Sequence, residues 1–315
     1  MEENKFSIAI PAYKANFLEE AIKSCLSQTY KNFELVIVDD FSPEDLKSIV
    51  APFLSDERVR YYRNEKNFGA VDVVDNWNRA LSFCTGQYVI CMGDDDRLMP
   101  CCLEEYAKLI EKYPGTKVFH AWSQIIDEKG NVTSLLESRP EWESAISFLW
   151  RRWGRGCEQF IGDFCFDIEE LRRQNGFFKQ PLAWASDDIS SFRAAMVNGI
   201  ANTQTFCFQY RVNSLTISNS GNMDIKLKAK KMEKEWYDFA LSKYMCQHET
   251  DDILLKFVKK QMPIYFYREN ASLMYHGMRQ SIFNFLFLIK NHTALDTSLK
   301  QVVKLFLKAI KSRIL

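Results

Sequence analysis

Two apolar, β-forming runs that each end abruptly in aspartates constrain the fold of this chain more than any other feature. Residues 35–38 are followed by Asp39 and Asp40, and residues 88–93 are followed by three aspartates at 94–96. Buried parallel strands deliver charges in this way to the carboxyl edge of a sheet, where open α/β sheets bind ligands. Three adjacent carboxylates are costly to bury without compensation, so we expect a divalent metal carrying a phosphate there.

Strand and helix patterns alternate along residues 6–120. The expected strands are 6–10, 33–38, 59–62, 88–92 and 117–120, with helices between them. Ser42 and Pro43 read as the N-cap and first residue of one of these helices. Such alternation predicts a mostly parallel sheet with right-handed crossovers.

Beyond residue 120 the alternation weakens. We expect a turn at 127–131 between short strands, helices at 141–150, 168–174 and 186–198, and a strand at 206–212. From about residue 224 the chain reads as Lys-rich helix to its end.

Charge and cysteine usage exclude several classes of protein. Lys+Arg and Asp+Glu number 41 each, so bulk charge does not favour a nucleic-acid partner. The 9 cysteines form no CxxC pair and only 4 histidines are present, so we expect buried free thiols rather than a zinc cluster. No apolar segment reaches the ~20 residues of a membrane span, and the N-terminus lacks a signal-peptide pattern. We therefore expect a cytoplasmic protein.

Short motifs follow one another in a fixed order over residues 5–215. They are FSIAIPAY (6–13), SQTY (27–30), VDDFS (38–42), NFG (67–69), NWNRAL (76–81), TGQYV (85–89), GDDDRLMP (93–100), NGF (175–177), DD (187–188) and YRVN (210–213). In this order and spacing they resemble the motifs of family 2 glycosyltransferases with the nucleotide-diphospho-sugar transferase (GT-A) fold. The chain departs from the family pattern at Phe41, at Gly93, where an acid often stands, and at Asn213, where His is usual.

The resemblance implies an α/β GT-A domain at 1–222, with a nucleotide-sugar-binding half (1–120) and an acceptor half (121–222), followed by a helical extension (223–315). It also implies inverting, metal-dependent transfer of a sugar from a nucleoside-diphosphate donor to an acceptor hydroxyl. A UDP-sugar is the first donor to consider, Mn²⁺ or Mg²⁺ the cofactor, and a glycan or lipid-linked glycan the acceptor. Bacterial surface polysaccharide synthesis is the family's commonest setting.

The resemblance to the family assigns the metal site to the acidic cluster. Pro100 fixes the register, so that Asp95 falls on the acid that ligates metal directly. Asp94 and Asp96 would reach the metal through water or contact the donor ribose. The competing explanation is a group of acids favoured by the N-terminus of the following helix.

The same resemblance assigns the binding of the donor base to residues at the ends of the first two strands. Asp40 would accept a hydrogen bond from the base, whereas Asp39, on the opposite face, would be held by backbone amides. The other residues expected at the donor are Pro11, Ala12, Tyr13 and Asn67. Asp40 could instead only cap its loop.

Asp188 is the expected general base, because a positioned carboxylate can take the proton of an attacking alcohol. The alternative is that Asp187 and Asp188 are first-turn helix acids. Arg211 would fold over the site and bind the diphosphate, or pair with an acid elsewhere. Trp184, with Trp150 and Trp153, flanks the expected acceptor side, where sugar stacking and core packing both remain open.

The end of the chain carries an apolar stripe with lysines beside it. The stripe is Leu299, Val302, Val303, Phe306, Ala309, Ile310 and Leu315, and the basic residues are Lys300, Lys304, Lys308, Lys311 and Arg313. This pattern fits peripheral contact with an anionic membrane at the inner face of the plasma membrane, and it equally fits a packed surface helix.

Two other functions remain open. A catalytically silent protein that binds nucleotide sugars would tolerate Gly93 and Asn213. A nucleotidyltransferase with a related sheet usually shows a Gly-rich phosphate loop near the first strand, and residues 10–15 contain no glycine.

Overall fold

The computed structural model describes residues 4–213, 223–246, 249–281, 283–295 and 297–314. Its centre is a 10-stranded sheet in the order β3-β2-β1-β4-β9-β6-β10-β5, with β7 beside β6 and β8 beside β10. The strands are β1 Phe6–Ala12, β2 Phe33–Asp39, β3 Val59–Arg63, β4 Tyr88–Cys91, β5 Arg97–Leu98, β6 Val118–Ile126, β7 Val132–Leu135, β8 Trp142–Glu143, β9 Phe164–Asp167 and β10 Ile200–Arg211.

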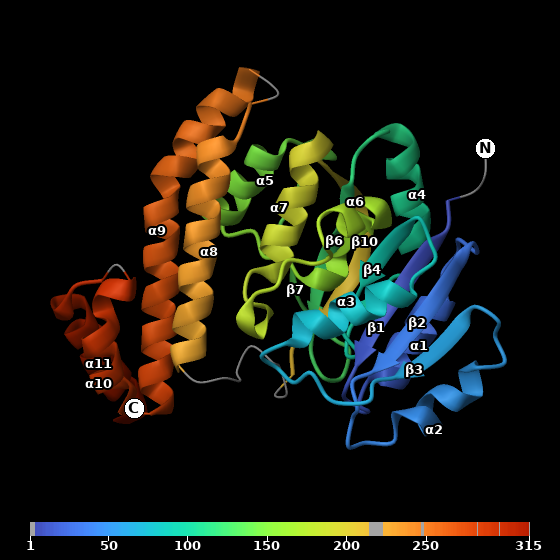
Figure 1. The fold of residues 1–315 in the computed structure, drawn as a ribbon, viewed down its shortest axis with the longest axis horizontal. Helices are drawn as coiled ribbons and strands as arrows, with labels where there is room; N and C mark the ends of the chain where they lie inside the picture. Colours follow the sequence, from blue (N-terminus) through green and yellow to red (C-terminus); the bar gives the residue numbers. More distant parts are fainter. Residues whose placement is uncertain (1–3, 214–222, 247–248, 282, 296, 315) are drawn as a thin grey trace.

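Helices cover both faces of this sheet and form the end of the chain (Figure 1). They are α1 Leu18–Leu26, α2 Leu46–Val50, α3 Val73–Phe83, α4 Cys102–Lys112, α5 Ala145–Trp150, α6 Ile168–Arg173, α7 Ser186–Asn198, α8 Met223–Lys243, α9 Glu249–Gln280, α10 Phe283–Asn291 and α11 Leu299–Ile314. Among the residues described, every helix is too short or too polar to cross a membrane.

The first four parallel strands bring the two aspartate-ending runs to one edge. β1 pairs in parallel with both β2 and β4, and Ala12 lies opposite Asp39. β1 also continues past Pro11 to Ala12, two residues beyond its expected end. Its ladder with β4 stops at Ala9, so the missing N–H of Pro11 falls past the end of that ladder. Loops 40–44 and 93–96 therefore leave the sheet side by side.

The sheet is mixed rather than mostly parallel. β9 runs antiparallel between β4 and β6, and β5 and β8 pair antiparallel with β10. β9 has only 4 residues and β5 only 2, too few to show a strand period in the sequence. Their places depend on long-range pairing rather than on local pattern.

Two helix starts differ from the expectation. α2 begins at Leu46 with Asp45 as its N-cap, which accepts the Ser48 amide, and the Ser42 hydroxyl donates to the Tyr13 carbonyl at 2.6 Å. α7 begins at Ser186 itself, and the preceding Ala185 adopts a left-handed conformation with φ of 59°. In the first helix the N-cap lies three residues later than expected, and in the second the expected N-cap is the first helical residue.

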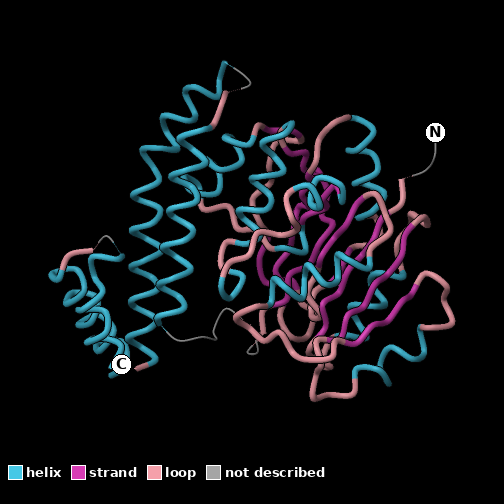
Figure 2. The backbone as a smooth tube through the Cα atoms, viewed as in Figure 1, coloured by secondary structure: helices cyan, strands magenta, loops and turns pink. Residues whose placement is uncertain are grey.

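The α8–α9 pair packs directly on the sheet domain (Figures 1 and 2). Trp153, from the turn after α5, is buried against Tyr237 of α8 and against Tyr265 and Phe266 of α9. The expected boundary at residue 222 therefore does not separate two cores, because α8 and α9 share one with α5 and α7. The 9 cysteines are free thiols, and seven of them are buried.

Candidate active site

A cavity of about 1310 Å³ opens where the carboxyl ends of the first strands meet α7, α8 and α9. It brings together residues that lie far apart in the sequence. The predicted site residues that line it are Pro11, Tyr13, Asp40, Asn67, Asp94, Asp95, Asp96 and Asp188. Thus Asp40, Asp95 and Asp188 surround a common hollow, as the predicted mechanism requires.

Asp40 lies at one end of the cavity and is held rigidly. Its carboxylate accepts hydrogen bonds from Asn64 Nδ2 at 2.9 Å, Asn67 Nδ2 at 3.0 Å and the Phe68 amide at 3.1 Å. Burial raises the pKa of Asp40 despite these donors. Asp39 faces away and accepts from the Ser42 amide, Tyr61 and Arg63.

Ala12 contributes to this end only indirectly. Its side chain is fully buried and is not among the cavity-lining residues. Its carbonyl accepts the Asp40 amide at 2.8 Å, which fixes the start of the Asp40 loop. Of the three residues expected at this position, Pro11 and Tyr13 line the cavity.

The acidic cluster is held by the β1 loop and by the end of β10. Asp94 accepts the amides of Tyr13 and Lys14, each at 2.7 Å. Asp95 Oδ2 accepts Lys14 Nζ at 2.6 Å and Asn213 Nδ2 at 2.7 Å. Asp96 Oδ1 accepts the Arg211 amide at 2.9 Å.

This cluster carries more negative charge than its surroundings stabilise. Burial raises the pKa of Asp94 to about 6, against the opposing effect of the Lys14 ammonium. Burial and the charge of Asp95 raise the pKa of Asp96 well above its usual value. A bound cation would favour the ionised form of both groups.

The oxygen atoms that face Gly93 fit a hard divalent cation. A Cβ placed on Gly93 would lie 2.8 Å from Asp95 Oδ1 and 2.9 Å from Asp96 Oδ2. The missing side chain thus leaves a gap between two carboxylate oxygens, the ligand type that Mg²⁺ and Mn²⁺ prefer. Within the described ranges, no group of three or more His, Cys, Asp or Glu forms a complete metal site, so water and phosphate oxygens would have to complete the coordination.

Arg211 does not lie where the sequence analysis expected it. Its side chain is only 1% exposed and is absent from the cavity lining. The guanidinium donates to the Asp95 carbonyl at 2.7 Å, to Glu20 at 2.6 Å and to carbonyls of the 127–128 turn. All its nitrogens are thereby engaged, so Arg211 supports the acidic loop from behind and does not reach a diphosphate.

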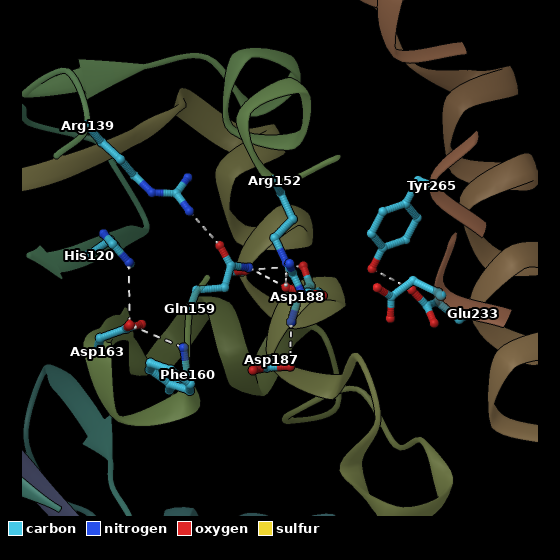
Figure 3. A network of polar contacts seen from close by, with 12 residues as sticks. His120, Arg139, Arg152, Gln159, Phe160, Asp163, Asp187, Asp188, Glu233 and Tyr265 are labelled. Carbon is cyan, nitrogen blue, oxygen red and sulfur yellow. Dashed lines mark hydrogen bonds and ion pairs between the residues drawn. The ribbon is translucent and has the colours of Figure 1, made fainter. Parts of the chain in front are cut away.

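Asp187 and Asp188 lie at the other end of the cavity, within a network of polar side chains (Figure 3). Asp188, only 4% exposed, accepts Arg152 Nε at 3.0 Å, Arg152 Nη2 at 3.2 Å and the Gln159 amide. Burial and the neighbouring Asp188 charge raise the pKa of Asp187 to about 8. A pKa of about 8 favours the neutral form of Asp187 at pH 7.

Sequence reasoning missed the residues that complete this end. Arg152 and Gln159 come from the segment before β9, and Lys230, Glu233 and Tyr265 come from α8 and α9. Tyr265 donates to Glu233 at 3.4 Å across from Asp188 (Figure 3). These residues lie 29 to 77 positions from Asp188 in no local pattern, so no motif could have identified them. Lys14, which contacts the acidic cluster, was also missed, although it directly follows the predicted site residue Tyr13.

Comparison with curated proteins finds glycosyltransferases. A protein of Rickettsia felis, described as an uncharacterized glycosyltransferase, is 32% identical over 140 residues, covering 44% of this chain and 22% of that protein. The GalNAc(5)-diNAcBac-PP-undecaprenol beta-1,3-glucosyltransferase of Campylobacter jejuni is 29% identical over 131 residues, covering 41% of each chain. The chain thus spans less than half the length of these relatives.

Solved structures with a similar fold cover more of the chain. Staphylococcus aureus TarS residues 1–349 in complex with UDP-GlcNAc superposes with a TM-score of 0.62 at 15% identity, over 97% of this chain and 79% of that chain. The UDP complex of the same protein gives 0.60, also at 15% identity, over 98% of this chain and 82% of that chain. At such low identity the likeness concerns the fold, and it confirms the expected GT-A architecture.

The family model described as "Glycosyl transferase family 2" matches residues 7–166. That match runs from β1 through β9 and includes both aspartate-ending strands with their loops. It covers half of the chain and confirms the resemblance found in the sequence. The chain therefore belongs to glycosyl transferase family 2.

Proposed function

We propose that this protein transfers one sugar, with inversion, from a nucleoside-diphosphate donor to a hydroxyl group of a glycan or lipid-linked glycan. The observation that carries the proposal is the single cavity that holds the 94–96 acidic loop at one side and the Asp187–Asp188 pair at the other. UDP-sugars are the donors to test first, since TarS, which has a similar fold, is solved with UDP-GlcNAc and with UDP.

The donor half has the groups to hold a nucleotide and its diphosphate. Asp40, fixed by Asn64 and Asn67, faces the cavity where it can accept from the base. Asp95 and Asp96 would hold Mg²⁺ or Mn²⁺ through the oxygens beside Gly93. Such an ion supplies positive charge to the leaving diphosphate. Lys14 and Asn213 orient the Asp95 carboxylate for this task.

Asp188 has the properties of a general base. Arg152 and Gln159 fix its orientation, and the Arg152 guanidinium lies directly against its carboxylate. These donors use three of the about four lone-pair sites of a carboxylate, which leaves one for an acceptor hydroxyl. As the hydroxyl oxygen bonds to the anomeric carbon, its proton passes to Asp188. The bond to the diphosphate breaks on the opposite face, and the diphosphate keeps the electron pair.

Donor binding and turnover, measured side by side, test this proposal. We expect calorimetry to show UDP binding that Mn²⁺ strengthens, and we expect the protein to hydrolyse or transfer the sugar of a UDP-, GDP- or dTDP-linked donor. Binding with no turnover of any donor would favour the silent nucleotide-sugar-binding protein. Absence of nucleotide binding would refute both functions.

The acceptor and its setting form a further part of the proposal. The name of the Campylobacter relative describes glucosyl transfer to an undecaprenol-linked saccharide. A lipid-linked glycan acceptor in bacterial surface polysaccharide synthesis is consistent with that name. It would place this chain at the cytoplasmic face of a membrane.

The exposed surface of α11 is consistent with this proposed membrane contact. Its Val302 and Ala309 are buried, whereas Leu299, Val303 and Leu307 form an exposed row. The lysines at 300, 304, 308 and 311 follow the same exposed side. Leu315 and the side chain of Arg313 lie outside the described residues. An apolar row flanked by cations matches an anionic lipid surface.

Vesicle sedimentation tests the membrane contact. We expect the protein to sediment with phosphatidylcholine–phosphatidylglycerol vesicles and to remain in solution with phosphatidylcholine alone. Joint replacement of Lys300, Lys304 and Lys311 by Gln should abolish the difference, whereas joint replacement of Lys23, Lys31 and Lys47 should not. Equal sedimentation of the two variants would refute a role for α11.

A further inference from the structure

The wall of the cavity formed by α8 contains a buried ammonium group that has no ion-pair partner among the described residues. Lys226 is only 6% exposed and lines the cavity. Within the described ranges it forms no hydrogen bond or ion pair, and its Nζ lies 5.6 Å from the centre of the Trp184 ring. Burial lowers the pKa of Lys226, and no neighbouring carboxylate opposes that effect.

Lys230, one helical turn further along α8, shows the contrast. Its Nζ lies over the same Trp184 ring at 5.6 Å, but it also contacts Glu233 at 3.0 Å and Glu269 at 3.2 Å. Burial lowers the pKa of Lys230, yet those two carboxylates more than reverse the effect. Two lysines on one helix face thus differ in whether the protein supplies their counter-charge.

None of the described carboxylates that line this end of the cavity forms an ion pair with Lys226. Asp188 is paired with Arg152, and Glu233 and Glu269 are paired with Lys230. The remaining titratable groups that line this end are Asp187 of α7 and His276 and Arg279 of α9. Asp187, with a pKa raised to about 8, is neutral at pH 7.

We infer that Lys226 and Trp184 form a subsite for a phosphate or carboxylate group carried by the acceptor. The inference rests on the proposed transferase function. A buried cation without a partner is costly, and an anion delivered by the substrate removes that cost. The aromatic ring beside it offers a flat apolar surface to a sugar ring.

The position of this subsite points to the acceptor rather than to the donor. Trp184 directly precedes Ala185 and the start of α7, which carries Asp187 and Asp188. Lys226 stands seven residues before Glu233, or about 10 Å along the helix axis. The anionic group would thus bind about 10 Å from the side of the cavity where Glu233 faces Asp188. The donor side has its own cation, Lys14.

Binding of small anionic probes to the full chain tests the inference. The probes are glycerol 3-phosphate, glucuronate and neutral glucose, measured by calorimetry in the presence of UDP and Mn²⁺. Lys226→Gln is compared with Lys228→Gln, which alters an exposed lysine of the same helix. We expect Lys226→Gln to weaken binding of at least one anionic probe about tenfold, and Lys228→Gln to change none.

Each outcome has a definite meaning. Loss of the phosphate probe alone assigns a phosphate-bearing acceptor, and loss of glucuronate alone assigns a carboxylate-bearing one. Equal binding to both variants, with UDP still bound, overturns the inference and leaves the proposed function standing. If Lys226→Gln weakens UDP binding by the same factor, Lys226 belongs to the donor site and the inference fails. If UDP binds to none of the proteins, the proposed function fails as well.

Discussion

The two acidic groups of the cavity are built in different ways. In the 94–96 loop, Asp94 accepts the amides of Tyr13 and Lys14 and Asp96 accepts the amide of Arg211, whereas Asp95 is held by side chains. The Asp187–Asp188 pair is held by side chains, Arg152 and Gln159, from a separate segment. A backbone amide remains when its residue is replaced by any residue other than proline, whereas a side-chain donor is lost with the residue that carries it. The donor side should therefore resist single substitutions better than the acceptor side.

Asp188→Asn should have the largest effect on turnover. Removal of a general base lowers the rate by about 10²–10⁴-fold. UDP affinity should stay unchanged, because Asp188 lies at the other end of the cavity. Transfer assays and calorimetry on the same preparation check both statements. Wild-type turnover in this variant would remove Asp188 from the mechanism.

Arg152→Met should have the largest effect on stability. The change leaves the buried Asp188 carboxylate without its ion-pair partner, which typically costs about 3–5 kcal/mol. Urea unfolding gives the change in free energy of unfolding. As a control, Lys23→Met breaks the exposed pair with Glu19 and should cost about 0–1 kcal/mol. Similar losses in the two variants would mean that the Arg152–Asp188 pair is not buried as described.

Gly93→Ala tests the donor side. The added methyl group would lie within 3 Å of both Asp95 Oδ1 and Asp96 Oδ2, at 2.8 and 2.9 Å, so those oxygens must move. We expect the strengthening of UDP binding by Mn²⁺ to fall about tenfold, with metal-free UDP binding unchanged. Gly154→Ala, where the nearest atom would be 3.5 Å away, is the control. An unaltered Mn²⁺ effect in Gly93→Ala would place the metal elsewhere.

A pH-dependent effect is expected from the titration of Asp187. Because its pKa is raised to about 8, the stability that its neutral form provides is lost as the pH rises toward and through that value. The wild-type protein should thus lose more stability than Asp187→Asn between pH values well below and well above 8. Urea unfolding of both proteins at each pH measures the difference. Parallel stability curves would show that Asp187 is not buried beside a charged Asp188.

The same contrast explains which parts of the site could be predicted from the sequence. Asp40 and the 94–96 acids were found because each directly follows an apolar strand, and a strand end is a local feature. Arg211 was misplaced, because its burial behind the acidic loop depends on Glu20 and the 127–128 turn. The mixed strand directions of the sheet were not predicted for a related reason, because long-range pairing inserts β9 between β4 and β6.

The acceptor side could not be assembled from sequence at all. Asp187 and Asp188 were recognised by their resemblance to a family motif, but nothing near them indicates Arg152 or Gln159. Lys226 reads as one lysine among many in a Lys-rich helix. Only the packing of α8 against Trp184 distinguishes it from Lys228.

The central claim is that donor and acceptor carboxylates act on one substrate pair in one cavity. Anomalous diffraction from crystals soaked with Mn²⁺ and a non-hydrolysable UDP-sugar tests it most directly. The account predicts a manganese peak beside the Asp95 and Asp96 oxygens at Gly93, with the anomeric carbon of the sugar facing Asp188. A nucleotide bound with its diphosphate away from residues 94–96, or with its sugar turned away from Asp188, would contradict it.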